Sequence, residues 1–209
     1  MKKDYTHIIF LIDRSGSMSL IKTDMEGGIA QFLKEQKELP GKCTLTAAQF
    51  DVHYDLMYSL VNLESVDTIK INPRGGTALI DSMVRLISDA GKELSALPEE
   101  ERPAKVLFVT ITDGEENASR EFTNAQLAEK IAHQEKVYNW QFTYIGANQD
   151  AFSVANKVGV RSEKTMNYQA TTRGVGKMFS KLSAASSRYR NDDSQAALFS
   201  FTVEEQKDV

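Results

Sequence analysis

The residues of this sequence best suited to chemistry are five oxygen-bearing side chains in three short segments. Asp13, Ser15 and Ser17 alternate in Asp-Arg-Ser-Gly-Ser, Thr77 follows a Gly-Gly pair, and Asp113 lies in Thr-Asp-Gly. They offer only carboxylates and hydroxyls, which are ligands of hard cations such as Mg²⁺, Mn²⁺ or Ca²⁺. Alternate spacing lets one loop turn several side chains toward one ion. The pattern predicts a metal site made entirely of oxygen ligands.

Simpler roles exist for some of these residues. Asp13 and Ser17 could cap the helix that follows them, because the first turn of a helix needs oxygen acceptors. Asp81, one helical turn after Thr77, could orient a metal-bound water or could simply be a solvated acid. The convergence of three separate segments favours the metal interpretation.

Two buried strands must position the acids. Residues 8–12 and 106–111 are apolar runs without polar alternation, which is typical of central strands in a parallel sheet. Asp13 and Asp113 directly follow these runs. Because ligands bind at the carboxyl ends of strands in open α/β sheets, both acids are expected at one sheet edge. The loop carrying Thr77 at a helix start is expected at the same edge.

The remaining elements alternate between strand and helix. Residues 44–50 and 54–63 predict an antiparallel hairpin, and apolar residues at helical spacing follow Met18 and Leu79. This order predicts an α/β fold with a doubly wound, mostly parallel sheet, one antiparallel edge strand and helices on both faces. Further strands are expected at 140–145 and 164–168, and further helices at 123–132, 152–158 and 175–189.

Composition narrows the class of protein. The chain has 209 residues, 41% of them hydrophobic, and a net charge of −4, as expected of a globular domain rather than a disordered chain. A single cysteine, Cys43, excludes an internal disulfide and a multi-thiolate zinc site. The acidic balance argues against nucleic-acid binding. Because no export signal or membrane span is recognisable, we expect a cytoplasmic protein without membrane contact.

The three motifs, in this order and on these elements, resemble the von Willebrand factor type A (VWA) domain over residues 5–160. Small intracellular bacterial and phage members, including those of tellurite-resistance loci, are similar. The resemblance implies a metal-ion-dependent adhesion site (MIDAS). In it Ser15, Ser17 and Thr77 ligate the metal, and Asp13 and Asp113 ligate directly or through water. An acidic side chain of a partner protein would complete the coordination.

These inferences predict a binding module rather than an enzyme, with no catalytic residues and with Mg²⁺ as the cation (Mn²⁺ or Ca²⁺ being possible). Residues 1–160 would form the VWA-like domain, and residues 161–209 an extension, helix plus tail, packed on it.

One alternative is a Mg²⁺-dependent phosphohydrolase with Asp13 as nucleophile. Such sites place a second Asp two residues on, where this chain has Ser15. Another is an assembly or structural protein that acts through the apolar run 196–203, which could add a strand to this sheet or to a neighbouring protomer. The partner's identity and the oligomeric state stay open.

Overall fold

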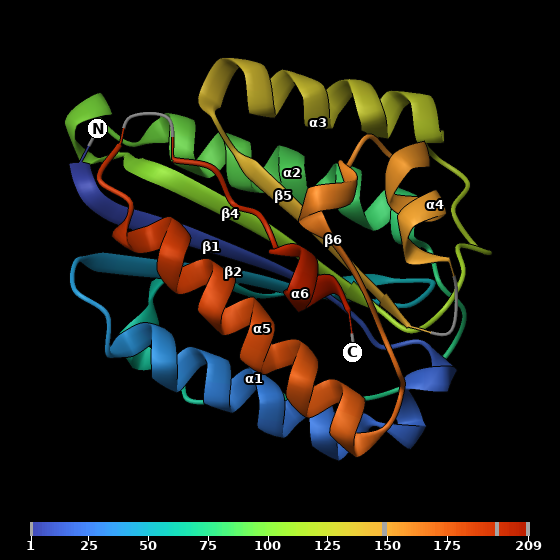
Figure 1. The fold of residues 1–209 in the computed structure, drawn as a ribbon. Coiled ribbons are helices and arrows are strands. Elements are labelled where there is room, and N and C mark those ends of the chain that lie inside the picture. Colours follow the sequence, from blue (N-terminus) through green and yellow to red (C-terminus); the bar gives the residue numbers. More distant parts are fainter. Residues whose placement is uncertain (1, 148–149, 195–196, 208–209) are drawn as a thin grey trace.

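A computed structural model describes residues 2–147, 150–194 and 197–207 of the chain. Six strands form one sheet in the order β3-β2-β1-β4-β5-β6 (Figure 1). Only the β2–β3 pair is antiparallel, which confirms the predicted α/β class with one antiparallel edge strand. The strands are β1 (Lys2–Asp13), β2 (Lys42–Phe50), β3 (Tyr54–Asn62), β4 (Pro103–Thr112), β5 (Gln141–Ala147) and β6 (Thr165–Tyr168).

Helices cover both faces of this sheet. α1 and α5 lie on one face, and α2, α3 and α4 on the other (Figure 1). Among the described residues, no helix is both long and apolar enough to cross a membrane. The helices are α1 (Lys22–Lys37), α2 (Leu79–Ala96), α3 (Asn124–Tyr138), α4 (Ala151–Lys157), α5 (Thr172–Asn191) and α6 (Val203–Gln206).

The central strand β1 explains the apolar run in the sequence. Ile8 and Phe10 pack toward α1 and α5, whereas Ile9 and Leu11 pack toward α2, and all four are fully buried. Because successive strand side chains point to opposite faces, a strand covered on both faces must be apolar throughout. β1 is therefore rigidly placed, and so is the loop at its carboxyl end.

The first helix differs from its prediction. The stripe that begins at Met18 is divided into a 3₁₀ turn over Gly16–Leu20 and the α-helix α1, which starts at Lys22. Met18 is buried as predicted, but the tighter 3₁₀ winding turns Ser17 outward, and Ser17 is exposed. Asp13 thus ends β1, Ser15 directly precedes the 3₁₀ turn and Ser17 lies within it, so all three residues of the first motif come before α1.

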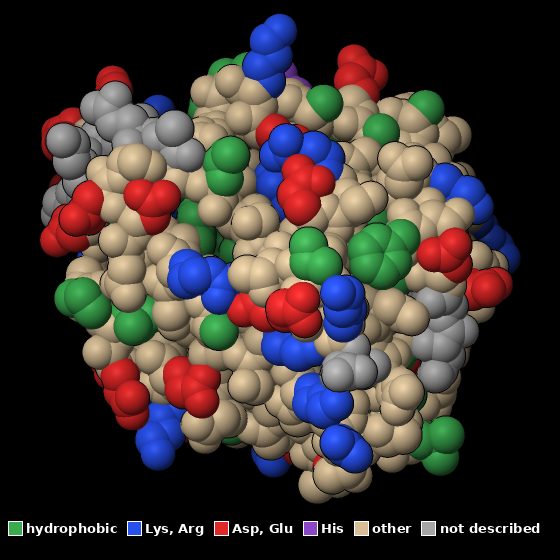
Figure 2. Space-filling view, viewed as in Figure 1, with side chains coloured by type: hydrophobic (Ala, Val, Ile, Leu, Met, Phe, Trp, Pro, Cys, Tyr) green, Lys and Arg blue, Asp and Glu red, His purple; other side chains and the backbone are tan. Residues whose placement is uncertain are grey.

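The C-terminal segment packs on the same sheet as the rest of the chain. α5 lies along α1, where Gly28 leaves room for the ring of Phe179. Phe199 and Phe201 are buried in the core on this face. Residues 197–202 form no strand, so the described part of this run adds no strand to its own sheet, and that expectation is wrong. A strand paired with a neighbouring protomer stays a prediction, and residue 196 lies outside the described residues. The outer surface here mixes charges of both signs (Figure 2).

Candidate metal centre

The structure brings the five predicted ligands together at the carboxyl edge of β1 and β4. The Ser17 hydroxyl donates to Asp113 Oδ1 at 2.7 Å, and the hydroxyl oxygens of Ser15 and Ser17 are 3.1 Å apart. Asp13 ends β1, and Thr77 lies just before α2. Four of the five residues are buried and only Ser17 is exposed. The cluster therefore opens to solvent on the side of the 3₁₀ turn.

Gly114 marks the point on which the three hydroxyls converge. A Cβ atom at this glycine would lie 3.2 Å from Thr77 Oγ1, 3.6 Å from Ser17 Oγ and 3.7 Å from Ser15 Oγ. Hydroxyls from two separate loops thus surround one small volume, with Asp113 as the neighbouring residue. A volume lined by neutral hydroxyls and two carboxylates suits a hard divalent cation.

Asp13 is held in place by neutral donors. Its Oδ1 accepts from the Ser15 amide at 2.6 Å, and its Oδ2 accepts from the Thr112 hydroxyl at 2.5 Å. Burial raises the pKa of Asp13 to about 6; the hydrogen bonds oppose this rise and the charge of Asp113 adds to it. Burial also raises the pKa of Asp113, against the hydrogen bond from Ser17. Two buried acids with raised pKa values gain most from a nearby cation.

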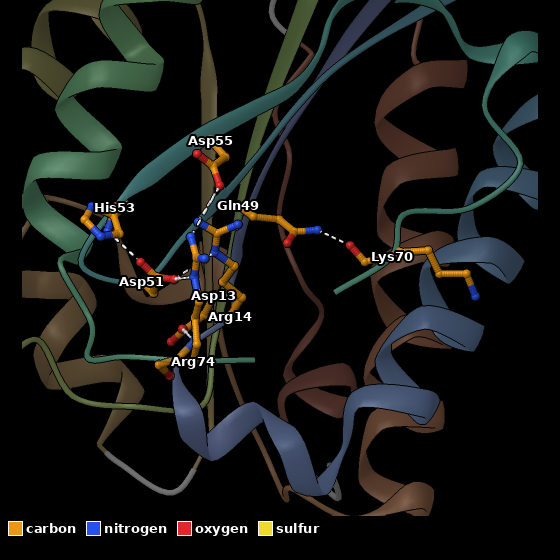
Figure 3. Close-up of polar contacts among 9 residues, drawn as sticks. Asp13, Arg14, Gln49, Asp51, His53, Asp55, Lys70 and Arg74 are labelled. Carbon is orange, nitrogen blue, oxygen red and sulfur yellow. Dashed lines mark hydrogen bonds and ion pairs between the residues drawn. The ribbon is translucent and has the colours of Figure 1, made fainter. Parts of the chain in front are cut away.

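A charge cluster centred on the buried Asp51 lies beside the predicted ligands, and sequence reasoning missed it (Figure 3). Asp51 Oδ2 accepts from Arg14 Nε at 3.0 Å and from Arg74 Nε at 2.7 Å, and Oδ1 accepts from the His53 amide at 2.6 Å. Burial alone would raise the pKa of Asp51, but these hydrogen bonds and the two guanidinium charges hold it below its usual value. Arg14 also pairs with Asp55.

This cluster joins the loops that carry the ligands. The Ala78 amide donates to the Asp51 carbonyl at 2.9 Å, and the Arg74 amide donates to the Arg14 carbonyl at 2.8 Å. Thr77, next to Ala78, also donates its amide to the Asn117 side chain at 2.9 Å. Asp51 directly follows strand β2, so the rule that located Asp13 and Asp113 could also have found it.

Asp81 has a structural partner rather than a place in the cluster. Its carboxylate accepts the backbone amides of residues 120–122, and Glu116 likewise accepts from the amides of Ile80, Ala118 and Ser119. These bonds fix the loop after β4 against the start of α2. In the described ranges, no group of three or more His, Cys, Asp or Glu residues could hold a metal ion. A cation here would therefore depend on the hydroxyls as well as the two carboxylates.

Comparisons with known proteins identify the fold. No protein-family model and no curated protein matches the sequence. One similar solved structure is proximal thread matrix protein 1 from the mussel byssus with a zinc-occupied MIDAS motif (TM-score 0.62, 15% identity, 88% of this chain and 46% of that one). Another is a von Willebrand factor type A protein from Catenulispora acidiphila (0.59, 16%, 88% and 43%). A third is the vWF domain of the type V pili tip protein Mfa5 from Porphyromonas gingivalis (0.58, 9%, 86% and 94%).

The chain spans less than half the length of the first two of these proteins, and nearly all of the third. By its architecture and by these structural likenesses, the chain has the fold of a von Willebrand factor type A domain.

Proposed function

We propose that this protein is a divalent-metal-dependent protein-binding module. Ser15, Ser17, Thr77, Asp13 and Asp113 would hold Mg²⁺, the carboxylates directly or through water. The observation that carries this proposal is the convergence of three hydroxyls around Gly114, beside both carboxylates. A protein of the same fold has zinc in its MIDAS motif, which supports a divalent cation at this position.

The donor set explains why a partner would be needed. Three of the five donors are neutral hydroxyls, so only Asp13 and Asp113 offset the charge of a divalent ion. If one of them acts through water, positive charge remains to attract an outside carboxylate. Mg²⁺ retains waters readily, which leaves exchangeable positions. Because Ser17 is on the exposed side of the cluster, we propose that an Asp or Glu of a partner protein approaches there.

The test is metal-dependent binding. Calorimetric titration with Mg²⁺ and Mn²⁺ should show one site in the wild-type protein and none in the Asp13→Ala protein. Partner capture in Mg²⁺ should be lost in EDTA and with Asp13→Ala. Asp67→Ala is the matched control, because Asp67 is exposed and pairs only with Lys37 among the described residues. Capture that survives both chelation and Asp13→Ala would refute the proposal.

The geometry does not favour the phosphohydrolase alternative. A nucleophilic carboxylate must be within reach of the substrate. Asp13 is fully buried, so a phosphate ester has less access to it than a small cation has. We therefore propose a protein that is not an enzyme. Assays with a panel of phosphate esters in Mg²⁺ test this, and turnover abolished by Asp13→Asn would overturn it.

A further inference from the structure

A second cavity lies far from the proposed metal centre, at the amino ends of β4 and β5. It has a volume of about 1060 Å³ and lies between the C-terminal halves of α2 and α3. This volume is of the size that small-molecule sites occupy. The amino and carboxyl ends of parallel strands lie at opposite edges of the sheet. The cavity is therefore independent of Asp13 and its neighbours.

The walls of this cavity combine apolar residues with charged and polar ones. Ile87 and Leu94 of α2, Val106 of β4 and Trp140 before β5 all line it, and all four are buried. Val137 of α3 also lines it and is 54% exposed. An apolar wall open to solvent on one side favours a ligand with an aliphatic part.

Two lysines add positive charge to this apolar site. Lys92 of α2 and Lys130 of α3 both line the cavity, and neither forms an ion pair with any residue that the structure describes. The third lysine, Lys105, differs because its amine donates to the carbonyls of Arg190 and Asp192. Arg102 also lines the cavity, but its guanidinium donates to the carbonyls of Ser95 and Leu97. The carboxylates of Asp192 and Asp193 line it as well, on the side of Lys105, whose charge they offset. Lys92 and Lys130 are therefore the cations available to an anionic ligand.

Gly91 keeps the α2 side of the cavity open. A Cβ atom at this position would have Gln134 Nε2 as its nearest neighbour, at 3.9 Å. Glycine within a helix costs about 1 kcal/mol relative to alanine. A larger side chain here would extend into the cavity without meeting the backbone.

We propose that this cavity binds a small amphiphile with one anionic head group and an aliphatic tail, such as a medium-chain carboxylate. The head would pair with Lys92 and Lys130, and the tail would lie against Val137, Leu94 and Trp140, of which Val137 is the most exposed. The same chemistry is offered by a free fatty acid and by a single-chain lipid, and the probes below separate these sources.

Trp140 provides a direct measurement. It is the only tryptophan of the chain, it lines the cavity and it is 3% exposed. Titration with decanoate below its micelle concentration should change tryptophan fluorescence saturably, with one site by calorimetry. Decan-1-ol, which has the same tail without the charge, should bind at least tenfold more weakly. A lysophospholipid of equal chain length identifies the lipid source if it binds more tightly than decanoate.

Variants make the test specific. Gly91→Leu should abolish decanoate binding, whereas Gly27→Leu should not, because Gly27 is an exposed helical glycine of α1 with equally open surroundings. Lys92→Gln combined with Lys130→Gln should weaken decanoate by about tenfold and leave decan-1-ol unchanged. Thermal unfolding verifies that each variant folds. The absence of saturable binding, binding unaffected by Gly91→Leu, or equal affinity for decanoate and decan-1-ol would each overturn the proposal.

Discussion

Asp13→Asn tests the electrostatics of the metal centre, because it should stabilise the metal-free protein while removing metal binding. Asparagine can keep one of the two observed hydrogen bonds and reverse the direction of the other. Its oxygen accepts from the Ser15 amide, and its amide group can donate to the Thr112 hydroxyl, which can turn toward the Gly114 carbonyl 3.1 Å away. What is lost is the buried negative charge.

The size of the effect follows from the raised pKa of Asp13. Burial moves the pKa from 3.8 to about 6, and each unit corresponds to about 1.4 kcal/mol. The folded protein holds this proton more tightly than the unfolded chain, so stability falls as pH rises from about 4 to about 6. Above this range the charge costs about 3 kcal/mol. Reversing one hydrogen bond costs about 1 kcal/mol, so the expected net gain is about 2 kcal/mol at pH 7.

Urea unfolding in EDTA, measured between pH 4 and pH 8, is the appropriate assay. The Asp13→Asn protein should be about 2 kcal/mol more stable than wild type at pH 7 and no more stable at pH 4. Adding Mg²⁺ should then raise the stability of the wild type alone, because only it binds the ion. A variant that is less stable at pH 7 in EDTA, or a difference that does not depend on pH, would refute this reasoning.

Three further predictions concern the site and the C-terminal segment. Asp51→Ala should lower the free energy of unfolding by about 3–5 kcal/mol and weaken Mg²⁺ binding, because the buried Arg14 loses its main partner. Asp55→Ala, at the exposed partner of Arg14, should cost less than about 1 kcal/mol. An equal effect of the two substitutions would contradict this role of Asp51. Gly114→Ala should lower metal affinity at least tenfold in calorimetry, with little change in urea unfolding, because the added methyl group would occupy the volume between the three hydroxyls. Unchanged affinity would show that the cation does not bind at this position. Phe199→Ala should lower the free energy of unfolding in urea by about 3–5 kcal/mol, because the ring is fully buried against Tyr189 and Phe201. An unchanged free energy would show that the segment after α5 does not contribute to the hydrophobic core.

Much of the fold was predictable because the order of apolar and polar residues within a short segment reflects how that segment is buried. The runs that became the centres of β1 and β4 are apolar except for Thr110, since helices cover both faces of the sheet. The hairpin of β2 and β3 follows from two strand-like segments joined by a short polar link. The place of Asp13 and Asp113 follows from one rule: parallel strands bring their carboxyl ends to the same edge.

Other features depend on contacts between residues far apart in the chain. The division of the first helical stripe and the irregular path of residues 197–202 are set by what lies against them, and short-range periodicity does not record this. Phe199 and Phe201 alternate as in a strand, yet both enter the core from an irregular segment. Side-chain burial there is decided by packing against α5 rather than by strand pairing.

The sequence by itself therefore determined the class of sheet, the edge at which oxygen ligands gather and the type of cation they suit. Tertiary structure decided how Asp51 joins Arg14 to Arg74, how Gly114 leaves room among the three hydroxyls, and where α2 and α3 leave a cavity. The physical reason is the separation in sequence between the residues that interact. Periodicity and strand ends are properties of neighbouring residues, whereas ion pairs, close approaches and cavities exist only when distant segments meet.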